Sequence, residues 1–319
     1  MKSKVMLLQD VDPAGKKYLE ENGCECILAV HDKGPALLEE IRKIDPDAFL
    51  ARVGGVSAEM MEAAPSLKVI AKHGVGVETV DIEAATKRGI PVVNVPDGNY
   101  QAVAEHAMFL IEACAKRYKE LAELFMKEGF QARDEVPHAV ELSGKTLGIL
   151  GCGRIGRALA HIASCGFGMK VIGWSRGLEA GTTTAEGITG GVSRDEVIQQ
   201  ADFLAVCLPS TPETRHSLGA KEFGMMKKTA FFINVARGNI AVEKELIRAL
   251  EEGRIAGAGL DVFDPEPPDQ NNPLLHRSNV VVTPHYAAFT DEAMLRMCMT
   301  ACRQIVDVLA GRKPKWRVN

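Results

Sequence analysis

The sequence has no long hydrophobic run. The apolar stretch nearest the N-terminus, residues 5–8, is too short for the apolar region of a secretory signal peptide. No segment approaches the roughly 18 consecutive apolar residues that a membrane span requires. We therefore expect a soluble chain in the cytoplasm, with no membrane partner.

An excess of one charge sign is also missing. The 319 residues include 38 basic and 42 acidic side chains, for a formal net charge of -4. Without a basic excess, nothing favours nucleic acid or an anionic surface as a partner. The composition, 46% hydrophobic and 25% charged, is that of a globular protein with a sizeable core.

The 8 cysteines are scattered, and they do not form the paired spacings of a zinc site. Cys298 and Cys302 are spaced to share one helix face, but no second Cys or His pair lies nearby in the sequence. Core packing is therefore favoured for these two residues, and we predict no metal site. Reduced thiols agree with the expected cytoplasmic location.

Short apolar runs alternate with segments of helical period along most of the chain. Before residue 96, strands are predicted at 4–8, 26–30, 48–53, 68–71 and 91–95. From residue 146 on, they are predicted at 146–150, 170–174, 203–207, 230–234, 257–260 and 280–283. Parallel strands need crossover connections, so this alternation favours an α/β fold with parallel sheets.

One interruption divides the pattern. Pro96-Asp97-Gly98-Asn99 is followed by a helix-favouring stretch over residues 100–128, and a last helix is predicted over residues 290–310. Because 319 residues exceed one typical domain, we predict two α/β units joined near residues 97–100.

A glycine motif follows the first strand of the second part. Gly151, Gly153 and Gly156 fit G-x-G-x-x-G, and Arg154 and Ile155 between them open the next helix. A strand before the motif, a helix after it and a second strand complete a unit of about 30 residues, as dinucleotide binding requires. The helix N-terminus would then meet the pyrophosphate.

The end of the next strand bears on the choice of cofactor. An acid there would bind the ribose 2′-OH of NAD, but the strand ends in Ser175-Arg176. A hydroxyl and a guanidinium suit a 2′-phosphate. The sequence therefore favours NADP over NAD, and NAD stays open.

Three later segments place Arg237, Glu266 and His285 just after predicted strands, where open α/β sheets bind ligands. Reduction of a 2-keto acid requires these residue types. A cation holds the carboxylate and carbonyl, an acid delivers a proton to the developing alkoxide, and a carboxylate keeps that acid charged. A neighbouring glutamate would raise the pKa of a histidine.

At these residues the sequence resembles the D-isomer-specific 2-hydroxyacid dehydrogenases. This family includes 3-phosphoglycerate dehydrogenase and the glyoxylate/hydroxypyruvate reductases. Further matching pieces occur in the same order along nearly the whole chain: residues 74–77, 94–96, Asn99, 103–105, 208–214 and 226–228.

The resemblance implies two Rossmann-like domains with an interdomain cleft. Residues 1–98 and 288–319 would form a flavodoxin-like substrate domain, and residues 99–287 the dinucleotide-binding domain. Homodimers built around the second domain are usual in this family. Since the chain ends without the C-terminal regulatory extension of many phosphoglycerate dehydrogenases, feedback control by serine is not expected.

The resemblance also assigns residue roles. Arg237 would bind the substrate carboxylate and carbonyl, His285 would be the acid/base, and Glu266 its partner. Residues expected near the cofactor are Leu208, Pro209, Thr214, Val235, Asp261 and Ala287. Residues expected near the substrate carboxylate are the backbone groups of Val53, Gly54, Gly55, Gly76 and Val77, with Arg52 matching a substrate-binding position of phosphoglycerate dehydrogenases.

The expected activity is hydride transfer between NAD(P)H and a small D-2-hydroxy or 2-keto acid. Hydroxypyruvate or glyoxylate is favoured, and phosphohydroxypyruvate is the alternative because of Arg52. A dinucleotide-sensing binding protein resembling co-repressors of this fold is the alternative of another class. Lys72 is interpreted either as a second cation that binds the substrate or as a surface charge, and the surface charge is preferred. His73 is a possible pocket residue, and His106 has no assignable role.

Overall fold

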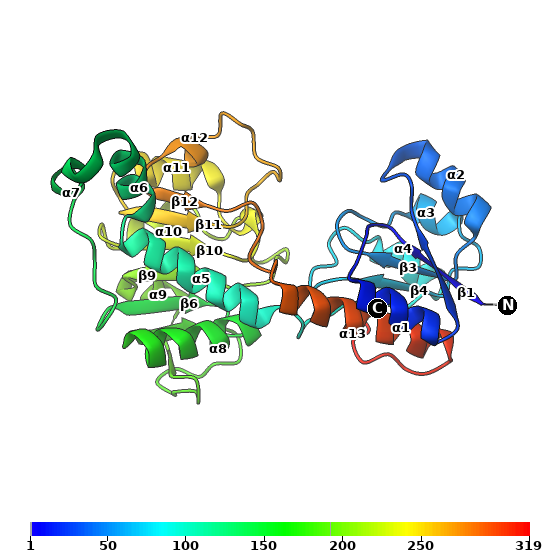
Figure 1. The fold of residues 1–319 in the computed structure, drawn as a ribbon. Coiled ribbons are helices and arrows are strands. Elements are labelled where there is room, and N and C mark those ends of the chain that lie inside the picture. The colour runs from blue at the N-terminus through cyan, green and yellow to red at the C-terminus, as the bar shows by residue number, and fades with distance from the viewer. Residues whose placement is uncertain (1, 192) are drawn as a thin grey trace. The chain divides into compact units, whose positions relative to one another are not determined.

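Two sheets of parallel strands organise the chain, one in each of two units (Figure 1). The computed structural model describes residues 2–191 and 193–319. Unit 1 comprises the residues up to Asn99 together with Phe289–Asn319, and unit 2 comprises Tyr100–Ala288. Within each sheet, every pairing between neighbouring strands is parallel, as the alternation of strands and helices predicts.

Unit 1 has a five-stranded sheet in the order β2-β1-β3-β4-β5, which is the flavodoxin-like order. Its strands are β1 (Ser3–Leu7), β2 (Cys24–Leu28), β3 (Ala48–Ala51), β4 (Val69–Lys72) and β5 (Val92–Val93). Its helices are α1 (Pro13–Glu21), α2 (Gly34–Ile44), α3 (Ala58–Glu62), α4 (Ile82–Lys87) and α13 (Asp291–Leu309).

The C-terminal helix belongs to the core of unit 1. Helix α13 packs against α1 and β4, and Cys298 and Cys302 are fully buried on it. Gly15 of α1 lies against both sulfur atoms, and a Cβ at Gly15 would stand 3.1 Å from Cys302 Sγ. The two cysteines therefore pack in the core, as their spacing on one helix face predicts.

Unit 2 has a seven-stranded sheet in the order β12-β11-β10-β9-β6-β7-β8, the Rossmann order with one added strand. Its strands are β6 (Thr146–Leu150), β7 (Lys170–Trp174), β8 (Ile188–Gly190), β9 (Phe203–Val206), β10 (Phe231–Asn234), β11 (Gly257–Leu260) and β12 (Val280–Val282). Its helical segments are α5 (Tyr100–Ala115), α6 (Tyr118–Glu128), η1 (Gly129–Gln131), α7 (Ala132–Glu135), α8 (Arg154–His161), the π-helical η2 (Ile162–Gly166), α9 (Arg194–Gln200), α10 (Ala220–Met225), η3 (Gly238–Ile240), α11 (Glu243–Glu251) and α12 (Pro273–His276).

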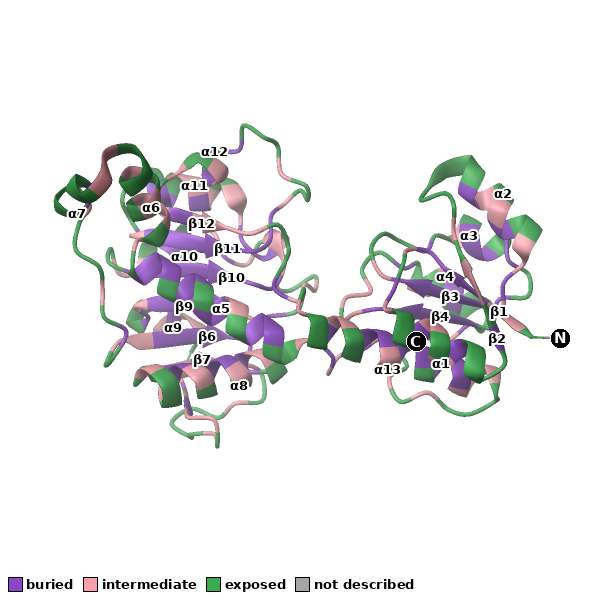
Figure 2. Ribbon diagram, in the orientation of Figure 1, coloured by how far each residue is buried: buried purple, intermediate pink, exposed green. Residues whose placement is uncertain are grey.

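Both faces of the unit 2 sheet are buried. On β10, Phe231 and Ile233 pack with residues of α5 and α8, whereas Phe232 between them packs with residues of α9, α10 and α11. The alternation follows from the two-residue period of a strand. Figure 2 shows the strands of this sheet mostly in the colour of buried residues. The prediction of an α/β fold with two Rossmann-like sheets is confirmed.

The helix-favouring stretch over residues 100–128 forms two helices, α5 and α6. The chain leaves the helix at Arg117, which has the left-handed φ of 51°, so α5 and α6 are separate. Helix α5 is largely buried, whereas α6 has no buried residue. Lys119 Nζ donates to the carbonyl oxygens of Leu275, Arg277 and Val280, which ties the start of α6 to the end of α12. No glycine or proline marks this break in the sequence.

Three strand predictions also need correction. Strand β2 lies two residues earlier than predicted, because Ser3 of β1 pairs with Cys24, and Val30 is 82% exposed. Strand β5 is reduced to Val92–Val93. The short edge strand β8 was not predicted; its three residues lie beside β7 at the margin of the sheet.

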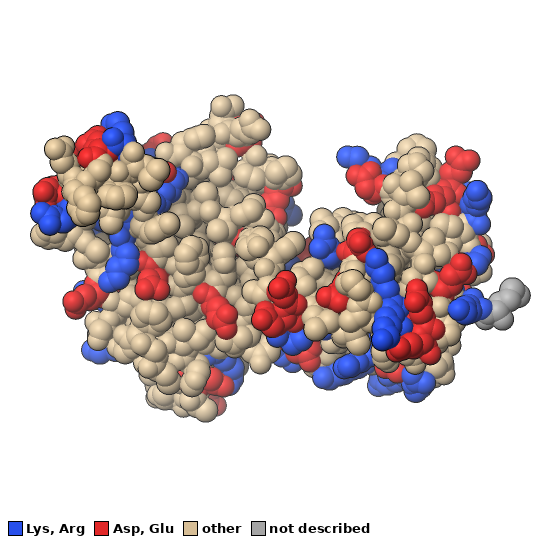
Figure 3. Space-filling model, in the orientation of Figure 1, with Lys and Arg blue, Asp and Glu red and all other residues tan. Residues whose placement is uncertain are grey.

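The surface carries charges of both signs. Figure 3 shows basic and acidic side chains interspersed on the face in view, in keeping with the small net charge. Among the described residues, no helix combines the length and hydropathy needed to cross a bilayer.

Candidate active site

The glycine motif lies where the strand order of unit 2 reverses. Strand β6 is flanked by β7 on one side and β9 on the other, so the loops after β6 and β9 diverge around Gly151. Gly151 has a φ of 100°, and a Cβ there would lie 2.6 Å from the carbonyl carbon of Cys207. Only glycine tolerates both conditions, and such a reversal is where open α/β sheets bind ligands.

The two other glycines of the motif serve the following helix. Gly153 is the N-cap of α8 and offers no side-chain cap, which leaves the first-turn N–H groups to another acceptor. A Cβ at Gly153 would meet nothing within 4 Å, so a ligand can approach the backbone. A Cβ at Gly156 would press on the carbonyl oxygen of Gly151 and stand 3.1 Å from Ile149. This cradle fits the pyrophosphate of a dinucleotide.

Strand β7 delivers the two residues that bear on the cofactor. Ser175 is half-buried and Arg176 is exposed directly after Trp174. Glu213, in the loop after β9, has a lowered pKa, chiefly because it accepts a hydrogen bond from the Thr211 hydroxyl, and the positive charge of Arg176 adds to the effect.

The remaining residues expected near the cofactor also gather at the carboxyl ends of the strands. Leu208, Val235 and Ala287 are buried there, after β9, β10 and β12. Thr214 Oγ1 donates to the Pro209 carbonyl at 2.6 Å and accepts from the Thr211 N–H at 2.8 Å, so its hydroxyl shapes this loop.

Asp261, directly after β11, is 1% exposed and organises the loop that follows β12. Its Oδ1 accepts from the Thr283 hydroxyl at 2.6 Å and from the Tyr286 N–H at 2.7 Å, and its Oδ2 accepts from the Ala287 N–H at 3.0 Å. Its backbone oxygen accepts from the His285 N–H at 2.8 Å. The structure thus gives this expected cofactor residue the role of a loop anchor.

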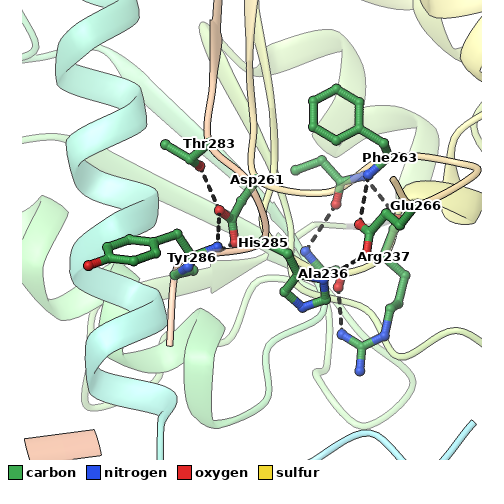
Figure 4. Close-up of polar contacts among 10 residues, drawn as sticks. Ala236, Arg237, Asp261, Phe263, Glu266, Thr283, His285 and Tyr286 are labelled. Atoms are coloured by element: carbon green, nitrogen blue, oxygen red, sulfur yellow. Dashed lines mark hydrogen bonds and ion pairs between the residues drawn. The ribbon is translucent and has the colours of Figure 1, made fainter. Parts of the chain in front are cut away.

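The anchored loop holds His285 beside Glu266 (Figure 4). His285 Nδ1 lies 2.8 Å from Glu266 Oε2, and the other oxygen, Oε1, accepts from the Phe263 N–H at 2.9 Å. The His285 side chain is 50% exposed. The backbone of His285 adopts a left-handed φ of 53°, which is uncommon for a residue other than glycine.

The two members of this pair shift each other's pKa in opposite directions. The hydrogen bond to Glu266 raises the pKa of His285, against the lowering effects of burial and of Arg237. Burial tends to raise the pKa of Glu266, but the hydrogen bonds from His285 and Phe263, with the charges of His285 and Arg237, hold it below its ordinary value. An imidazolium–carboxylate pair is therefore favoured near neutral pH.

Arg237 joins this pair from β10. It follows Asn234 by three residues and is the N-cap of η3, and its Nη1 donates to the Ala236 carbonyl at 2.7 Å. Gly238 lets this turn approach the backbone of residues 263 and 264, since a Cβ there would lie 2.7 Å from the Asp264 nitrogen. Figure 4 shows the Arg237 guanidinium, the His285 ring and Glu266 grouped together. The structure brings together the three predicted catalytic residues.

A cavity of about 300 Å³ lies beside the pair. Apart from Glu266 and His285, it is lined mostly by apolar and proline side chains: Phe263, Pro267, Pro268, Leu275, Val282, Thr283 and Pro284. Low polarity on this side strengthens the electrostatic interaction between imidazole and carboxylate.

The residues expected near the substrate carboxylate lie in unit 1, on loops after β3 and β4. The Arg52 guanidinium lies 5.9 Å from the Phe289 ring centroid, and its buried Nε has no hydrogen-bond partner. The Val53 N–H, one of the groups expected to meet the substrate carboxylate, donates to Gln9 Oε1 at 3.0 Å. Gly54, with a φ of 82°, and Gly55 continue this loop, and Gly76 and Val77 lie on the loop after β4.

Two neighbouring residues in β4 and after it are buried. Lys72 is 8% exposed, and its Nζ donates to the Gly54 carbonyl at 3.0 Å and to Thr79 Oγ1 at 3.3 Å. The preferred interpretation of Lys72 as a surface charge is therefore wrong. His73 is buried against Cys298 of α13, and its Nε2 has no hydrogen-bond partner. Its contact with α13 makes it part of the core.

Sequence reasoning missed the contacts of His106. On α5, its Nε2 lies 2.9 Å from Thr283 Oγ1 and 3.5 Å from Asp261 Oδ1. A histidine inside an apolar helix was the available signal, but only the fold brings residue 106 beside residues 261 and 283.

The opposed shifts predict the effect of removing the carboxylate. Burial and the charge of Arg237 lower the pKa of His285, and the Glu266 carboxylate opposes them. In Glu266→Gln this carboxylate is lost, so the pKa of His285 should fall to or below its ordinary value of about 6.5. NMR titration of the His285 ring protons measures this, with Glu252→Gln, at the C-cap of α11, as a control. An unchanged or raised pKa in Glu266→Gln would contradict the assignment.

Comparisons with known proteins agree with this geometry. A family model described as D-isomer specific 2-hydroxyacid dehydrogenase, NAD binding domain, matches residues 108–287. The glyoxylate reductase of Thermococcus litoralis is 40% identical over 330 residues, covering 100% of this chain and 97% of the relative. The D-3-phosphoglycerate dehydrogenase of Methanocaldococcus jannaschii is 39% identical over 317 residues, covering 99% of this chain but 59% of the relative.

A solved structure gives the same result. The NADPH-dependent glyoxylate/hydroxypyruvate reductase of Sinorhizobium meliloti, in complex with NADP and malonate, has a TM-score of 0.86 and 28% identity, covering 100% of this chain and 97% of that one. With a glycine cradle at the sheet reversal and a family match over more than half its length, the chain belongs to the D-isomer-specific 2-hydroxyacid dehydrogenase family.

Proposed function

We propose that this protein is an NADP-dependent D-2-hydroxyacid dehydrogenase that reduces a small 2-keto acid. The observation that carries the proposal is the 2.8 Å contact between His285 Nδ1 and Glu266 Oε2, with Arg237 beside it, at the carboxyl ends of a dinucleotide-binding sheet. A proton donor, its orienting carboxylate and a fixed cation are the groups that carbonyl reduction needs.

Each residue has a defined task in this proposal. A bound nicotinamide dinucleotide supplies the hydride. Arg237 binds the substrate carboxylate and polarises the carbonyl oxygen. His285, charged because of Glu266, donates its Nε2 proton to the developing alkoxide, while Nδ1 stays bonded to Glu266. Reduction requires the imidazolium, so its rate should fall as the pH rises through the raised pKa of His285, whereas oxidation requires the neutral ring.

Hydroxypyruvate or glyoxylate is the proposed substrate, with D stereochemistry. The names of the Thermococcus and Sinorhizobium relatives support this choice. In unit 1, the backbone N–H groups of Gly54, Gly76 and Val77 are the proposed ligands of the substrate carboxylate. Phosphohydroxypyruvate remains the alternative, because the buried Nε of Arg52 has no hydrogen-bond partner and the Methanocaldococcus relative is named for that chemistry.

NADP is the proposed cofactor because Ser175 and Arg176 stand where an NAD-specific enzyme places an acid. Arg176 is exposed directly after Ser175, so its guanidinium is accessible to a ribose phosphate. The name of the Sinorhizobium reductase, which was solved with NADP, supports the same choice.

A homodimer in the cytoplasm is the proposed state. Helix α6 and η1 expose a group of large apolar side chains, and Phe125 and Phe130 contact each other edge to face at 5.9 Å. Met126 is 84% and Phe130 86% exposed. Contiguous exposed apolar surface marks an interaction site, and a twofold axis lets the same face of a second copy cover it. All eight cysteines are free thiols, which suits a reducing compartment.

Turnover tests the reaction. With NADPH, the protein should reduce glyoxylate or hydroxypyruvate, and His285→Ala should lower kcat by about 10²–10⁴-fold because the proton donor is lost. The decrease in NADPH absorbance measures both. His161→Ala on the surface of α8 is the matched control and should keep the wild-type rate.

Other outcomes of this assay have defined meanings. Faster reduction of phosphohydroxypyruvate, lost selectively in Arg52→Leu, would replace the proposed substrate with the phosphorylated one. NADPH binding without turnover of any 2-keto acid would reject the enzyme and favour the dinucleotide sensor.

Kinetics with both cofactors test the choice of NADP. Arg176→Ala should raise the KM for NADPH by about 10-fold, the loss expected for a charge-assisted hydrogen bond of about 1.5 kcal/mol, and leave the KM for NADH nearly unchanged. Arg248→Ala on α11 should change neither value. A wild-type preference for NADH of tenfold or more would overturn the assignment.

Light scattering after size-exclusion chromatography tests the dimer. The wild-type protein should elute as a dimer, and Phe125→Asp with Phe130→Asp should give a monomer, because two charges cannot be buried in an apolar interface. Val30→Asp, at an exposed apolar position of unit 1, is the control. A monomeric wild type, or a dimer that survives both changes, would reject the α6 face.

A further inference from the structure

We propose that His106 is a positioning residue for the acid/base His285, acting through the hydroxyl of Thr283 and the carboxylate of Asp261. The inference rests on the proposed function, since it assumes that His285 transfers the proton. His106 lies on α5, and among the described residues its polar contacts are with Thr283 and Asp261 rather than with Glu266 or Arg237. It therefore acts on the loop that carries His285 and not on the His285 ring itself.

The direction of the hydrogen bonds defines the chain of contacts. The Thr283 hydroxyl has one proton, which it donates to Asp261 Oδ1 at 2.6 Å. Its oxygen must therefore accept from His106 Nε2, 2.9 Å away. His106 thus carries its proton on Nε2. Burial lowers the pKa of His106 in spite of the nearby Asp261 charge, so one proton on Nε2 and none on Nδ1 is the form expected near neutral pH.

Asp261 links the contact between His106 and Thr283 to the backbone of the loop that carries His285. Its backbone oxygen and its two carboxylate oxygens accept, respectively, the N–H groups of His285, Tyr286 and Ala287. Two different N–H groups are satisfied only if the carboxylate keeps one rotation about its Cβ–Cγ bond. Thr283 and His106 both lie beside Oδ1 and keep the Asp261 carboxylate from rotating about this bond.

His285 needs such support because of its backbone. A left-handed φ of 53° is strained for a residue with a Cβ, and such conformations persist where the surroundings fix them. The three N–H groups held by Asp261 are those of His285 and the two residues after it. Loosening Asp261 therefore changes the aim of the imidazole toward Glu266 and the substrate.

The support comes from a rigid element. Helix α5 is buried along most of its length, and the His106 side chain itself is 14% exposed and packs against Phe109, with ring centroids 5.7 Å apart. Functional groups held by side chains on helices are placed more exactly than those on free loops. Figure 4 shows Thr283 and Tyr286 on one side of Asp261, and His285 with Glu266 and Arg237 on the other.

Variants at both ends of the contact test the inference. His106→Leu removes the donor, and Thr283→Val removes the hydroxyl while keeping the shape. Each should lower kcat about 10- to 100-fold, the range for a small misplacement of a catalytic group, with the KM for NADPH within about twofold of wild type. The double variant should be no slower than the slower single variant, because both changes break one chain of contacts.

Conservative variants separate positioning from packing. His106→Gln places an amide N–H near the position of Nε2, and Thr283→Ser keeps the hydroxyl, so both should recover most of the lost rate. His161→Leu on α8 makes the same chemical change on the surface and should leave the rate unchanged. If His106→Leu fails to fold, Thr283→Val and Thr283→Ser still carry the test.

The pH dependence gives a readout that a loss of stability alone would not move. The charged groups facing His285 are Glu266 and Asp261, which raise its pKa, and Arg237, which lowers it. In His106→Leu and Thr283→Val the His285 ring should lie less favourably toward the carboxylates of Glu266 and Asp261. The pKa of His285 should therefore fall, and the upper limb of the pH profile for reduction should move to lower pH with it. NMR titration of His285 without substrate measures the same shift independently of turnover.

The outcomes are distinguishable. Wild-type kcat and an unshifted His285 pKa in folded His106→Leu and Thr283→Val would overturn the inference. Additive losses in the double variant, or no recovery in His106→Gln and Thr283→Ser, would also overturn it. Absence of turnover in the wild type would reject the proposed function, and the NMR shift would still decide whether His106 positions His285.

Discussion

The loop that carries His285 depends on one buried carboxylate. Asp261 is 1% exposed, and the backbone N–H groups of three successive residues end on its oxygens. An unpaired charge at this depth would be costly, so the residue is tolerable only because these donors and the Thr283 hydroxyl surround it. The same bonds hold His285 in a left-handed backbone conformation that places its ring beside Glu266.

The balance of effects around the pair can be judged from signs alone. Burial and Arg237 both lower the pKa of His285, yet the net shift is upward, so the hydrogen bond to Glu266 and the charges of Glu266 and Asp261 together outweigh them. For Glu266, burial is the largest single effect, and it is overcome only by the sum of two hydrogen bonds and two positive charges. The ion pair exists between the pKa of Glu266 and the pKa of His285. Because the first is lowered and the second is raised, the pH range of the ion pair is wider than for the two free side chains. The positive charge of Arg237 limits how far the pKa of His285 can rise.

Local patterns were enough to predict much of this architecture. Strands such as Gly257–Leu260 carry an uninterrupted apolar run, and Gly151 and Gly156 stand where a Cβ would clash with the backbone. The predictions failed where the deciding contact is distant in sequence. The break at Arg117 reflects the different burial of α5 and α6, and no residue type marks it. Lys72 looked like a surface charge because its acceptors lie outside its own strand: Gly54 is in the loop after β3, and Thr79 is in the loop after β4.

The two units use the same device at the loops that matter most. In unit 2, Asp261 after β11 accepts the N–H groups of the loop after β12. In unit 1, Gln9 after β1 accepts the N–H groups of Arg52 and Val53, and Lys72 at the end of β4 donates to the Gly54 carbonyl. In each case a polar side chain at the carboxyl end of one strand fixes the backbone beyond a neighbouring strand. Parallel sheets favour this arrangement because those ends lie side by side. Residue type and position at a strand end therefore cannot distinguish a ligand of the substrate from an anchor of its loop. Lys72 and Asp261 both hydrogen-bond to backbone groups of a neighbouring loop, so the structure shows each of them anchoring that loop.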